Sequence, residues 1–350
     1  MKNRHLSVVL LALLSLTTMA QTFVEGTSYY LPRTAINFAI RVERTSTEPG
    51  ELCMYAERFL KKRDVALQPS TTFRIVGIDT YCTGVRDTTK LYTARIDAKH
   101  SIASLKVGDD GIILAVNGQP KSVKMPEPFI AAPKSAVLNP HDYMNQDILA
   151  AGSSAKTAEL AAQEIYDIRE SRSQLTRGQA DFMPKDGEQL RLMLKNLDTQ
   201  ETALLQLFEG VTERDTVETV YTLIPEKEVK QHVLFRFSQR LGLLDDDDLA
   251  GVPYYIGIED LHSMPTNTAI ADEAKRPKDD ANIFVIMPGK IRMTLSRSEQ
   301  ELLMQELYAA QFGKTAPLDN ELFGKKLFTS VVYNPITGSV EEIQTEMMKK

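Results

Sequence analysis

Two amphipathic segments between residues 152 and 210 constrain the fold more than any other feature of the chain. In the first, apolar side chains recur every three or four residues, at Ala158, Ala161, Ala162, Ile165, Ile168 and Leu175. In the second, similar spacing places Leu190, Met193, Leu194, Leu197, Leu204, Leu205 and Phe208 on one side. This period predicts two long helices, each with one apolar face. Each helix buries only one face, so the pair needs a sheet or a partner to cover what remains.

Local signals mark where these two helices begin and end. Gly178 is typical of a helix C-terminus, and Pro184 cannot continue a helix from the preceding turn. Asp186 is a good N-cap, and Gln189, three residues later, can complete a capping box. Gly210 closes the second helix. We therefore expect an antiparallel helical hairpin.

Two charged residues interrupt the apolar faces, Arg172 in the first helix and Glu201 in the second. A hairpin folded near Phe182 would set Arg172 opposite Leu192 rather than opposite Glu201. We expect both charged side chains at the rim, where they reach water, because charged residues are rarely fully buried. The alternative is a buried polar contact that orients the hairpin against its sheet.

Alternating apolar and polar residues on both sides of the hairpin predict strands. The clearest alternation lies in residues 34–43, where Ile36, Phe38 and Ile40 share one side. Gly108-Asp-Asp-Gly111 predicts a turn between strands at 104–107 and 112–116. Further strands are expected at 71–80, 91–97, 216–224, 230–237, 254–258, 283–287, 290–295, 326–333 and 339–343, and further helices at 51–63 and 298–312.

The expected fold class is α+β, with antiparallel β-sheet regions flanking a central antiparallel helical hairpin, because neighbouring strands are joined by tight turns. Five prolines between Pro120 and Pro140 predict an extended linker and a domain boundary. The expected order is a signal peptide (1–20), an N-terminal β-rich domain with one short helix (21–118), the Pro-rich linker (119–150), and a last part (151–350). In that last part the hairpin (152–210) precedes a C-terminal antiparallel β-rich domain.

The first twenty residues have the pattern of a secretory signal peptide. Lys2 and Arg4 precede an apolar run at 6–16 that is too short to span a bilayer as a helix. Thr18 and Ala20 place small residues before a cleavage site ahead of Gln21. We expect an exported protein, periplasmic or associated with the cell surface, with the signal peptide cleaved near Ala20. A retained anchor is the alternative.

The two cysteines, Cys53 and Cys82, form an even pair in a chain expected to enter an oxidising compartment. Such a pair predicts a disulfide, which would close a loop of about 30 residues and contribute roughly 3–4 kcal/mol. The alternative is two buried free thiols.

Composition and motifs favour few chemistries. The formal charge of −6 gives no electrostatic reason to bind nucleic acid. The sequence lacks the phosphate-binding, dinucleotide-binding, zinc-protease and hydrolase-elbow motifs, so we expect no cofactor and assign no catalytic residue. The absence of Trp weakens a carbohydrate-stacking platform.

The run Asp245, Asp246, Asp247 and Asp248 is the one weak candidate for a metal site. Four carboxylates suit a hard cation such as calcium. The spacing of an EF-hand fails, however, because its twelfth position would be Ile256. A solvated acidic turn is the favoured interpretation.

Several segments resemble one family across nearly the whole mature chain. They are Tyr30-Leu-Pro-Arg-Thr-Ala, Ile165-Tyr-Asp-Ile-Arg-Glu-Ser-Arg, Pro184-Lys-Asp-Gly187, residues 200–210 with Leu207-Phe-Glu-Gly210, and Val332-Tyr-Asn-Pro-Ile-Thr-Gly338. With these the chain resembles an uncharacterised exported Bacteroidota family, domain-of-unknown-function family 4831. The resemblance implies a periplasmic or surface location in the envelope and brings no catalytic residues.

We expect a non-catalytic binding or scaffolding module that engages another envelope protein or a glycan, without a transmembrane segment in the mature chain. The alternative is an envelope hydrolase that acts on glycan or peptide through carboxylates brought together by the fold. A cleft with two facing acids would favour the hydrolase, and an apolar patch would favour the binding module.

Overall fold

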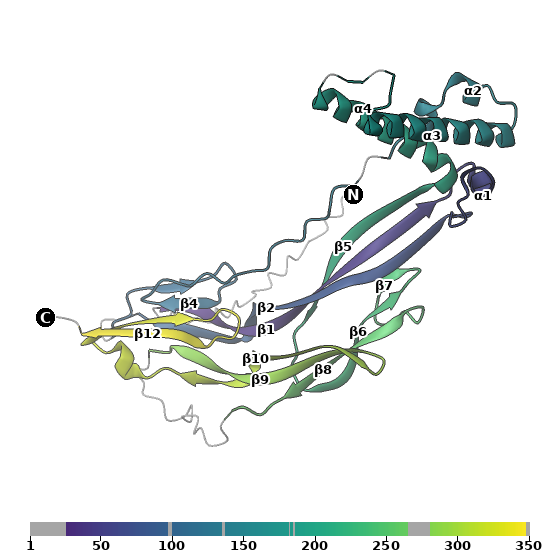
Figure 1. The fold of residues 1–350 in the computed structure, drawn as a ribbon. Coiled ribbons are helices and arrows are strands. Elements are labelled where there is room, and N and C mark those ends of the chain that lie inside the picture. Colours follow the sequence, from purple (N-terminus) through teal and green to yellow (C-terminus); the bar gives the residue numbers. More distant parts are fainter. Residues whose placement is uncertain are drawn as a thin grey trace, which may run out of the picture.

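The structure is a computed structural model that describes residues 26–96, 100–134, 137–181, 183–184, 186–264 and 281–347. The predicted signal peptide, with its cleavage site near Ala20, lies outside the described residues. Of the described residues, 47% lie in strands and 22% in helices. Figure 1 shows an elongated β-body with the helices α1 to α4 gathered at one end.

Strand β1 (Gly26–Glu48) is the centre of a sheet with the order β2–β1–β5, all antiparallel. Its neighbours are β2 (Ser70–Arg95) and β5 (Val211–Leu223). The predicted alternation is confirmed, because Ile36, Phe38 and Ile40 are fully buried on one side. The strand is longer than expected because β2 pairs with it from Gly26 to Thr47. Its other face, with Ala35 and Ala39, is also buried.

A second sheet packs on this buried face. Its order is β10–β9–β8–β6–β7. The strands are β6 (Val229–Ser238), β7 (Gly242–Leu244), β8 (Val252–Asp260), β9 (Phe284–Arg297) and β10 (Gln300–Pro317). Phe235, Ile256 and Met293 meet Phe38 and Ile40 of β1 in one apolar core. The two sheets therefore bury their apolar faces against each other, as in a sandwich.

The third sheet lies at the end of the body far from the helices and has the order β12–β11–β4–β3 (Figure 1). Its strands are β3 (Leu105–Val107), β4 (Ile113–Val116), β11 (Leu327–Tyr333) and β12 (Val340–Met347), with the 3₁₀ turn η4 (Asn320–Phe323) before β11. The predicted hairpin at Gly108–Gly111 is confirmed, since β3 and β4 are paired. Tyr29 and Leu31, at the start of β1, belong to this sheet's core.

Two of the helices at the other end of the body are long: α3 (Ser154–Arg177) and α4 (Gly187–Glu209). The others are short: η1 (Cys53–Tyr55), α1 (Ala56–Leu60), η2 (Pro140–Tyr143) and α2 (Gln146–Leu149). The predicted ends hold: the Asp186 side chain accepts from Gln189 N at 2.7 Å, and Gly178 is the left-handed cap of α3. In the described residues, no helix has both the length and the apolar composition that a bilayer crossing requires.

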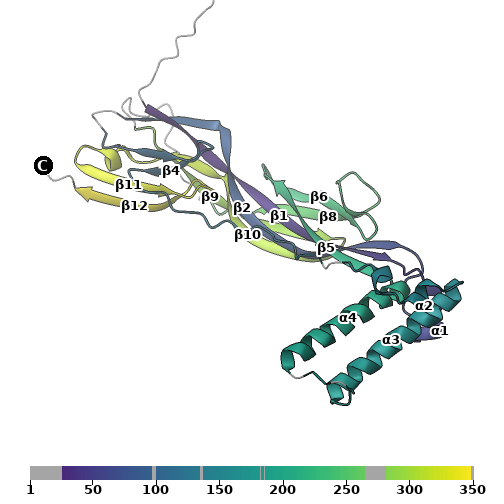
Figure 2. The ribbon, with the colours of Figure 1, turned by 90° about the horizontal axis from the view of Figure 1, so that it is seen from above.

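The expected fold class is wrong. The protein is mostly β, with three antiparallel sheets among its described residues, and no central hairpin is flanked by sheets. The apolar faces of α3 and α4 pack on each other and on Leu52, Ala56 and Ile148. Short helical segments from elsewhere in the chain thus supply the cover that we expected from a sheet or a partner. Figure 2 shows this helical group projecting from the end of the β-body.

The helix predicted at 298–312 is also wrong, because this segment lies in strand β10. Ser298 has a φ of 53° and lies in a tight turn, after which Gln300 pairs with Arg297 of β9. Leu303 and Leu307 pack against the core of the sandwich. Pairing with β9 overrides the local helical spacing, since burial of a strand outweighs intrinsic propensity.

The predicted disulfide is absent, and both cysteines are free. Cys82 lies in β2 opposite Ile36, whereas Cys53 lies in η1, beyond the end of β1. The eleven steps from Ile36 to Thr47 span roughly 36 Å of strand. A disulfide needs Cα atoms within about 7 Å of each other.

The expected rim position holds for Arg172, whose side chain is 38% exposed, but it is wrong for Glu201. Glu201 is only 7% exposed and accepts from Arg169 Nε at 2.6 Å and lies 2.8 Å from Arg172 Nη1. Arg172 also contacts Asp198 at 2.6 Å. The helices are therefore not arranged symmetrically about residue 182, and the buried polar contact is the one that forms.

The proline-rich segment, residues 119–139, is an extended chain without regular structure where it is described. Ion pairs connect its two ends to the sheets: Lys121 with Glu342 at 2.9 Å and Lys134 with Asp215 at 3.7 Å. Strands from both sides of it share sheets, since β1 pairs with β5 and β4 with β11. The segment therefore runs along the body as a strap, and we use that name for residues 119–139.

Candidate binding site

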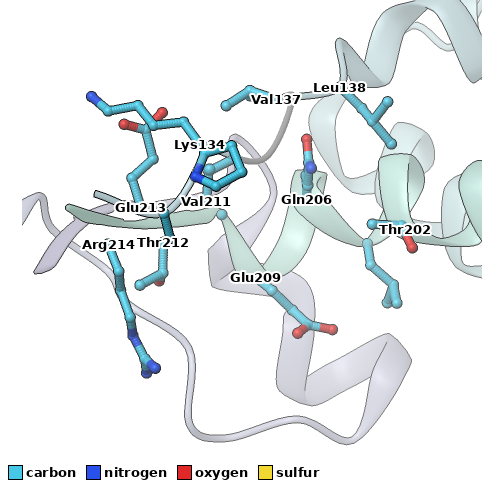
Figure 3. A pocket seen from close by; sticks show the side chains of 14 residues that line it. Lys134, Val137, Leu138, Thr202, Gln206, Glu209, Val211, Thr212, Glu213 and Arg214 are labelled. Atoms are coloured by element: carbon cyan, nitrogen blue, oxygen red, sulfur yellow. The ribbon is translucent and has the colours of Figure 1, made fainter. Parts of the chain in front are cut away.

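A cavity of about 660 Å³ lies where α4 passes into β5, beneath the strap (Figure 3). Its volume is within the range of roughly 300–1,000 Å³ that is common for ligand sites. The strap forms one wall, and the last turns of α4 with the start of β5 form the other. The lining residues are Ala132, Pro133, Lys134, Val137, Leu138, Thr202, Leu205, Gln206, Glu209, Gly210, Val211, Thr212, Glu213 and Arg214.

Two glycines allow the chain to turn so sharply at this point. Gly210 has φ 76° and ψ −163°, a conformation that is essentially reserved for glycine. A Cβ atom on Gly210 would lie 1.9 Å from the carbonyl oxygen of Glu48, and one on Gly50 would lie 2.3 Å from that of Leu207. Leu52 N donates to Leu207 O at 2.7 Å. The end of α4 is therefore fixed against the end of β1.

Charges on the cavity wall are partly neutralised. Glu209, at the C-terminus of α4, forms an ion pair with Lys62, which offsets the unfavourable position of a carboxylate at the negative end of a helix. Lys134 of the strap lies 3.7 Å from Asp215. Glu213 and Arg214 are exposed neighbours in β5, so they point to opposite faces of the sheet. Figure 3 shows them on opposite sides of the strand.

Gln206 is a polar residue of the wall whose side-chain oxygen lacks a hydrogen-bond donor. Its Oε1 atom is buried and accepts no hydrogen bond from the described residues. In Figure 3 its carboxamide points between Val137 and Leu138. A buried acceptor without a partner costs about 1–3 kcal/mol. Because protein atoms cover Oε1, a ligand donor recovers that free energy only if the Gln206 side chain turns toward the cavity.

The free edge of β5 is the second source of polar groups. β5 pairs with β1 on one side and is the outer strand of its sheet. Among the described residues, the strap forms no backbone hydrogen bond with β5. The cavity thus separates a strand edge from an extended chain. An edge strand presents a row of N–H and C=O groups that can pair with another extended chain.

The sequence-predicted candidates lie elsewhere. Asp245 to Asp248 form an exposed turn after β7, where Asp248 Oδ1 accepts from Ala250 N at 2.9 Å. In the described part of the chain, no three His, Cys, Asp or Glu side chains gather as a metal site requires. Cys53 and Cys82 are outside this cavity.

No local pattern in the sequence points directly to this cavity. In the sequence, Pro133 reads as part of a linker and Gly210 only as the end of a helix. Only the approach of the strap to β5, far away in sequence, combines them into one site. The residues that sequence reasoning missed are Gln206 and the edge at 211–214, because an unpaired strand edge is visible only once the sheet order is known.

Comparison with known proteins identifies the family. The chain belongs to the family described as Domain of unknown function (DUF4831), whose model matches residues 25–341. No curated protein and no solved structure matches the chain.

Proposed function

We propose that this DUF4831 member is an exported, non-catalytic binding module of the cell envelope, which holds an extended polypeptide segment of another envelope component. The segment would lie between the edge of β5 and the strap. The observation that carries the proposal is this open edge, which lines a cavity of about 660 Å³ without pairing to the strap in the described residues.

Backbone pairing supplies affinity in this arrangement. A peptide that adds to a sheet edge forms main-chain hydrogen bonds, and pockets for alternate side chains give specificity. Thr212 and Arg214 project to one face of the edge and Val211 and Glu213 to the other, because successive side chains alternate. Both faces are represented in the cavity lining.

The cavity wall fits an apolar side chain flanked by polar groups. Leu205, Val211 and Leu138 offer apolar surface, and Gln206 offers the buried acceptor for an N–H group. Exposed Arg214 and Glu213 suit an acidic and a basic side chain in neighbouring positions of the bound strand, since facing side chains share a face of the sheet. None of the lining residues is aromatic, which favours polypeptide over glycan as the ligand.

Export is supported by the charged, apolar and small-residue pattern of residues 1–20. N-terminal sequencing of the protein from the periplasmic and membrane fractions is expected to begin at Gln21. A chain that retains Met1 in the cytosol would contradict export, and it would leave the peptide-binding part of the proposal to the experiment below.

The binding site is tested by a photo-crosslinking amino acid placed at Glu213 in living cells. We expect a crosslinked protein that is absent when the same group replaces Leu249, which is 83% exposed in the acidic turn. Peptide mapping should locate the crosslink in an extended segment of the partner. Equal products from both positions, or none from Glu213, would contradict the proposal.

A matched pair of variants shows whether the cavity itself is needed. Thr202 lines the cavity, and Thr199 lies one turn earlier on α4 outside the lining; both hydroxyls donate to a carbonyl four residues before. Thr202→Trp should fill the cavity and abolish the Glu213 crosslink, whereas Thr199→Trp should leave it unchanged. Circular dichroism of both variants checks that the helices remain folded.

A further inference from the structure

A second cavity, of about 430 Å³, lies at the other end of the strap. Four parts of the chain enclose it: strand β2, the β3–β4 hairpin, the turn after β11, and the start of the strap. Its lining residues are Cys82, Thr83, Gly84, Gly108, Asp109, Asp110, Ile112, Leu114, Val123, Met125, Pro335 and Ile336.

Close backbone packing shapes the floor of this cavity. A Cβ atom on Gly84 would lie 1.9 Å from the carbonyl oxygen of Pro335, so the turn after β11 sits directly on β2. Asn334 Oδ1 accepts from Ile336 N at 2.9 Å, which holds the turn in place. Ile112 is 2% exposed beside it. The floor is therefore part of the folded body and needs no rearrangement to exist.

Apolar side chains with unusual exposure form the overhanging wall. Val123 and Met125 of the strap are 38% and 57% exposed, although both border the cavity. With Leu114 and Ile336 they surround a space lined by aliphatic groups and a thioether. An apolar ligand that removes this wall from water gains free energy in proportion to the apolar area buried. Met adapts its shape readily to a ligand.

The charge of the lining has one sign. Asp109 and Asp110 are its charged residues, and both are exposed at the rim. Asp110 Oδ1 accepts from Ile112 N at 3.0 Å, so the orientation of this carboxylate is fixed by the hairpin. Neither carboxylate forms an ion pair with a described residue. An apolar space bordered by two such carboxylates complements a molecule that joins an apolar body to a cation.

We propose that this second cavity binds a small hydrophobic amine, with the hydrocarbon part between Leu114 and Met125 and the ammonium group at Asp109 and Asp110. Hydrophobic burial supplies most of the affinity, and the carboxylates select the sign of the head group. This site is separate from the polypeptide site at β5, and each can fail without the other.

Cys82 provides a direct reporter of occupancy. Cys82 is a half-buried lining residue that also packs against the sandwich core, and burial raises the pKa of its thiol. A ligand in the cavity would lie against this residue and slow its alkylation. The chain has two cysteines, so Cys53→Ser leaves Cys82 as the one reactive thiol.

The experiment compares three probes with one hydrocarbon chain, octylammonium, octanol and octanoate, on the Cys53→Ser protein. We expect octylammonium to slow iodoacetamide alkylation of Cys82 and to bind in calorimetry, octanol to bind more weakly, and octanoate to give no protection. Equal protection by all three would overturn the selection of a cation, and no protection by any would overturn the site.

Variants separate the two parts of the recognition. Asp109→Asn with Asp110→Asn keeps the oxygen that accepts from Ile112 N and should weaken octylammonium binding roughly fivefold without affecting octanol. Met125→Gln should weaken both probes. Asp247→Asn and Met54→Gln are exposed controls outside the lining and should change neither. Unchanged octylammonium binding in the double variant would show that the carboxylates play no part.

Discussion

The side-chain amide of Gln311 pairs with the backbone of Thr34 as a strand would. Thr34 N donates to Gln311 Oε1 at 2.9 Å, and Gln311 Nε2 donates to Thr34 O at 2.9 Å. β5 ends opposite Ile36, so the edge of β1 has no strand beside it at Thr34. A break in register between Ala309 and Lys314 lets β10 present Gln311 there. One side chain thus completes the first sheet and joins it to the second.

Gln311→Ala should therefore destabilise the protein by about 2 kcal/mol, because it leaves a buried backbone donor and acceptor unpaired. The free energy of unfolding in urea measures the effect. Gln300→Ala, at the exposed start of β10, is the control and should change stability by less than about 0.5 kcal/mol. If both variants were equally stable, the pairing would have no energetic importance.

A substitution at Tyr333 should raise stability instead of lowering it. Its hydroxyl is buried without a partner among the described residues, and the side chain is 1% exposed. Tyr333→Phe should stabilise the protein by about 1 kcal/mol, since it removes an unpaired polar group. Tyr29→Phe is the contrast: the Tyr29 hydroxyl donates to Asn282 O and accepts from Phe284 N, both at 2.8 Å, so its loss should destabilise.

Tyr333 should also make the free energy of unfolding depend on pH. Burial raises the pKa of Tyr333 far above its usual value. The folded state keeps the Tyr333 proton, whereas the unfolded chain loses it near pH 10. The contribution of Tyr333 to the free energy of unfolding is therefore constant below that pH and falls as the pH rises above it. The slope of unfolding free energy against pH above 10 should be smaller in Tyr333→Phe. An unchanged slope would contradict the assignment.

Glu201 should show strong non-additivity with its two arginines. Either Arg169→Ala or Arg172→Ala leaves the buried carboxylate one cationic partner, but the double variant leaves it none. We expect about 1 kcal/mol for each single change, discounted because the arginines are partly exposed, and about 4 kcal/mol for the double. Chemical denaturation of all four proteins gives the coupling. Additive losses would show that Glu201 reaches water.

Two helix-ending glycines make a matched pair. Gly178→Ala adds a methyl group in open space at φ 70° and should cost about 1 kcal/mol of backbone strain. Gly210→Ala adds the same strain in a region closed to other residues and collides with Glu48 O, so its cost should be roughly 3 kcal/mol. Thermal or urea unfolding measures both costs. Equal costs would show that the backbone at Gly210 is not packed tightly against Glu48.

Alkylation of the unreduced protein tests the free thiols. We expect two labels by mass spectrometry, with Cys82 reacting more slowly at neutral pH because burial raises its pKa and lowers its thiolate fraction. The Cys82 rate should keep rising above pH 8.5, the usual value for a free thiol. If the protein took up label only after reduction, Cys53 and Cys82 would be shown to form a disulfide.

Local chemistry allowed part of the fold to be anticipated. The Asp186 cap, the left-handed Gly178 and the turn at Gly108–Gly111 depend on neighbours within a few residues, so they could be predicted. The alternation around Phe38 likewise identified the buried face of β1. Each of these features is complete within one turn or one strand.

The candidate sites could not be anticipated in this way. Leu303 and Leu307 have spacing that suits a helix, and only pairing with β9 makes β10 a strand. The cavity at Gln206 requires the strap, α4 and β5 to meet, and the cavity at Cys82 requires a hairpin, a distant turn and the other end of the strap.

The sequence alone determined the helix ends, the tight turns and the apolar faces, because these depend on backbone preferences and side-chain order over a few residues. Tertiary structure decided which face meets which, that Glu201 is buried between two arginines, and that Cys53 lies far from Cys82. The physical reason is that sheet order is set by pairing between strands more than a hundred residues apart, such as β1 and β5, and no local pattern encodes the partner.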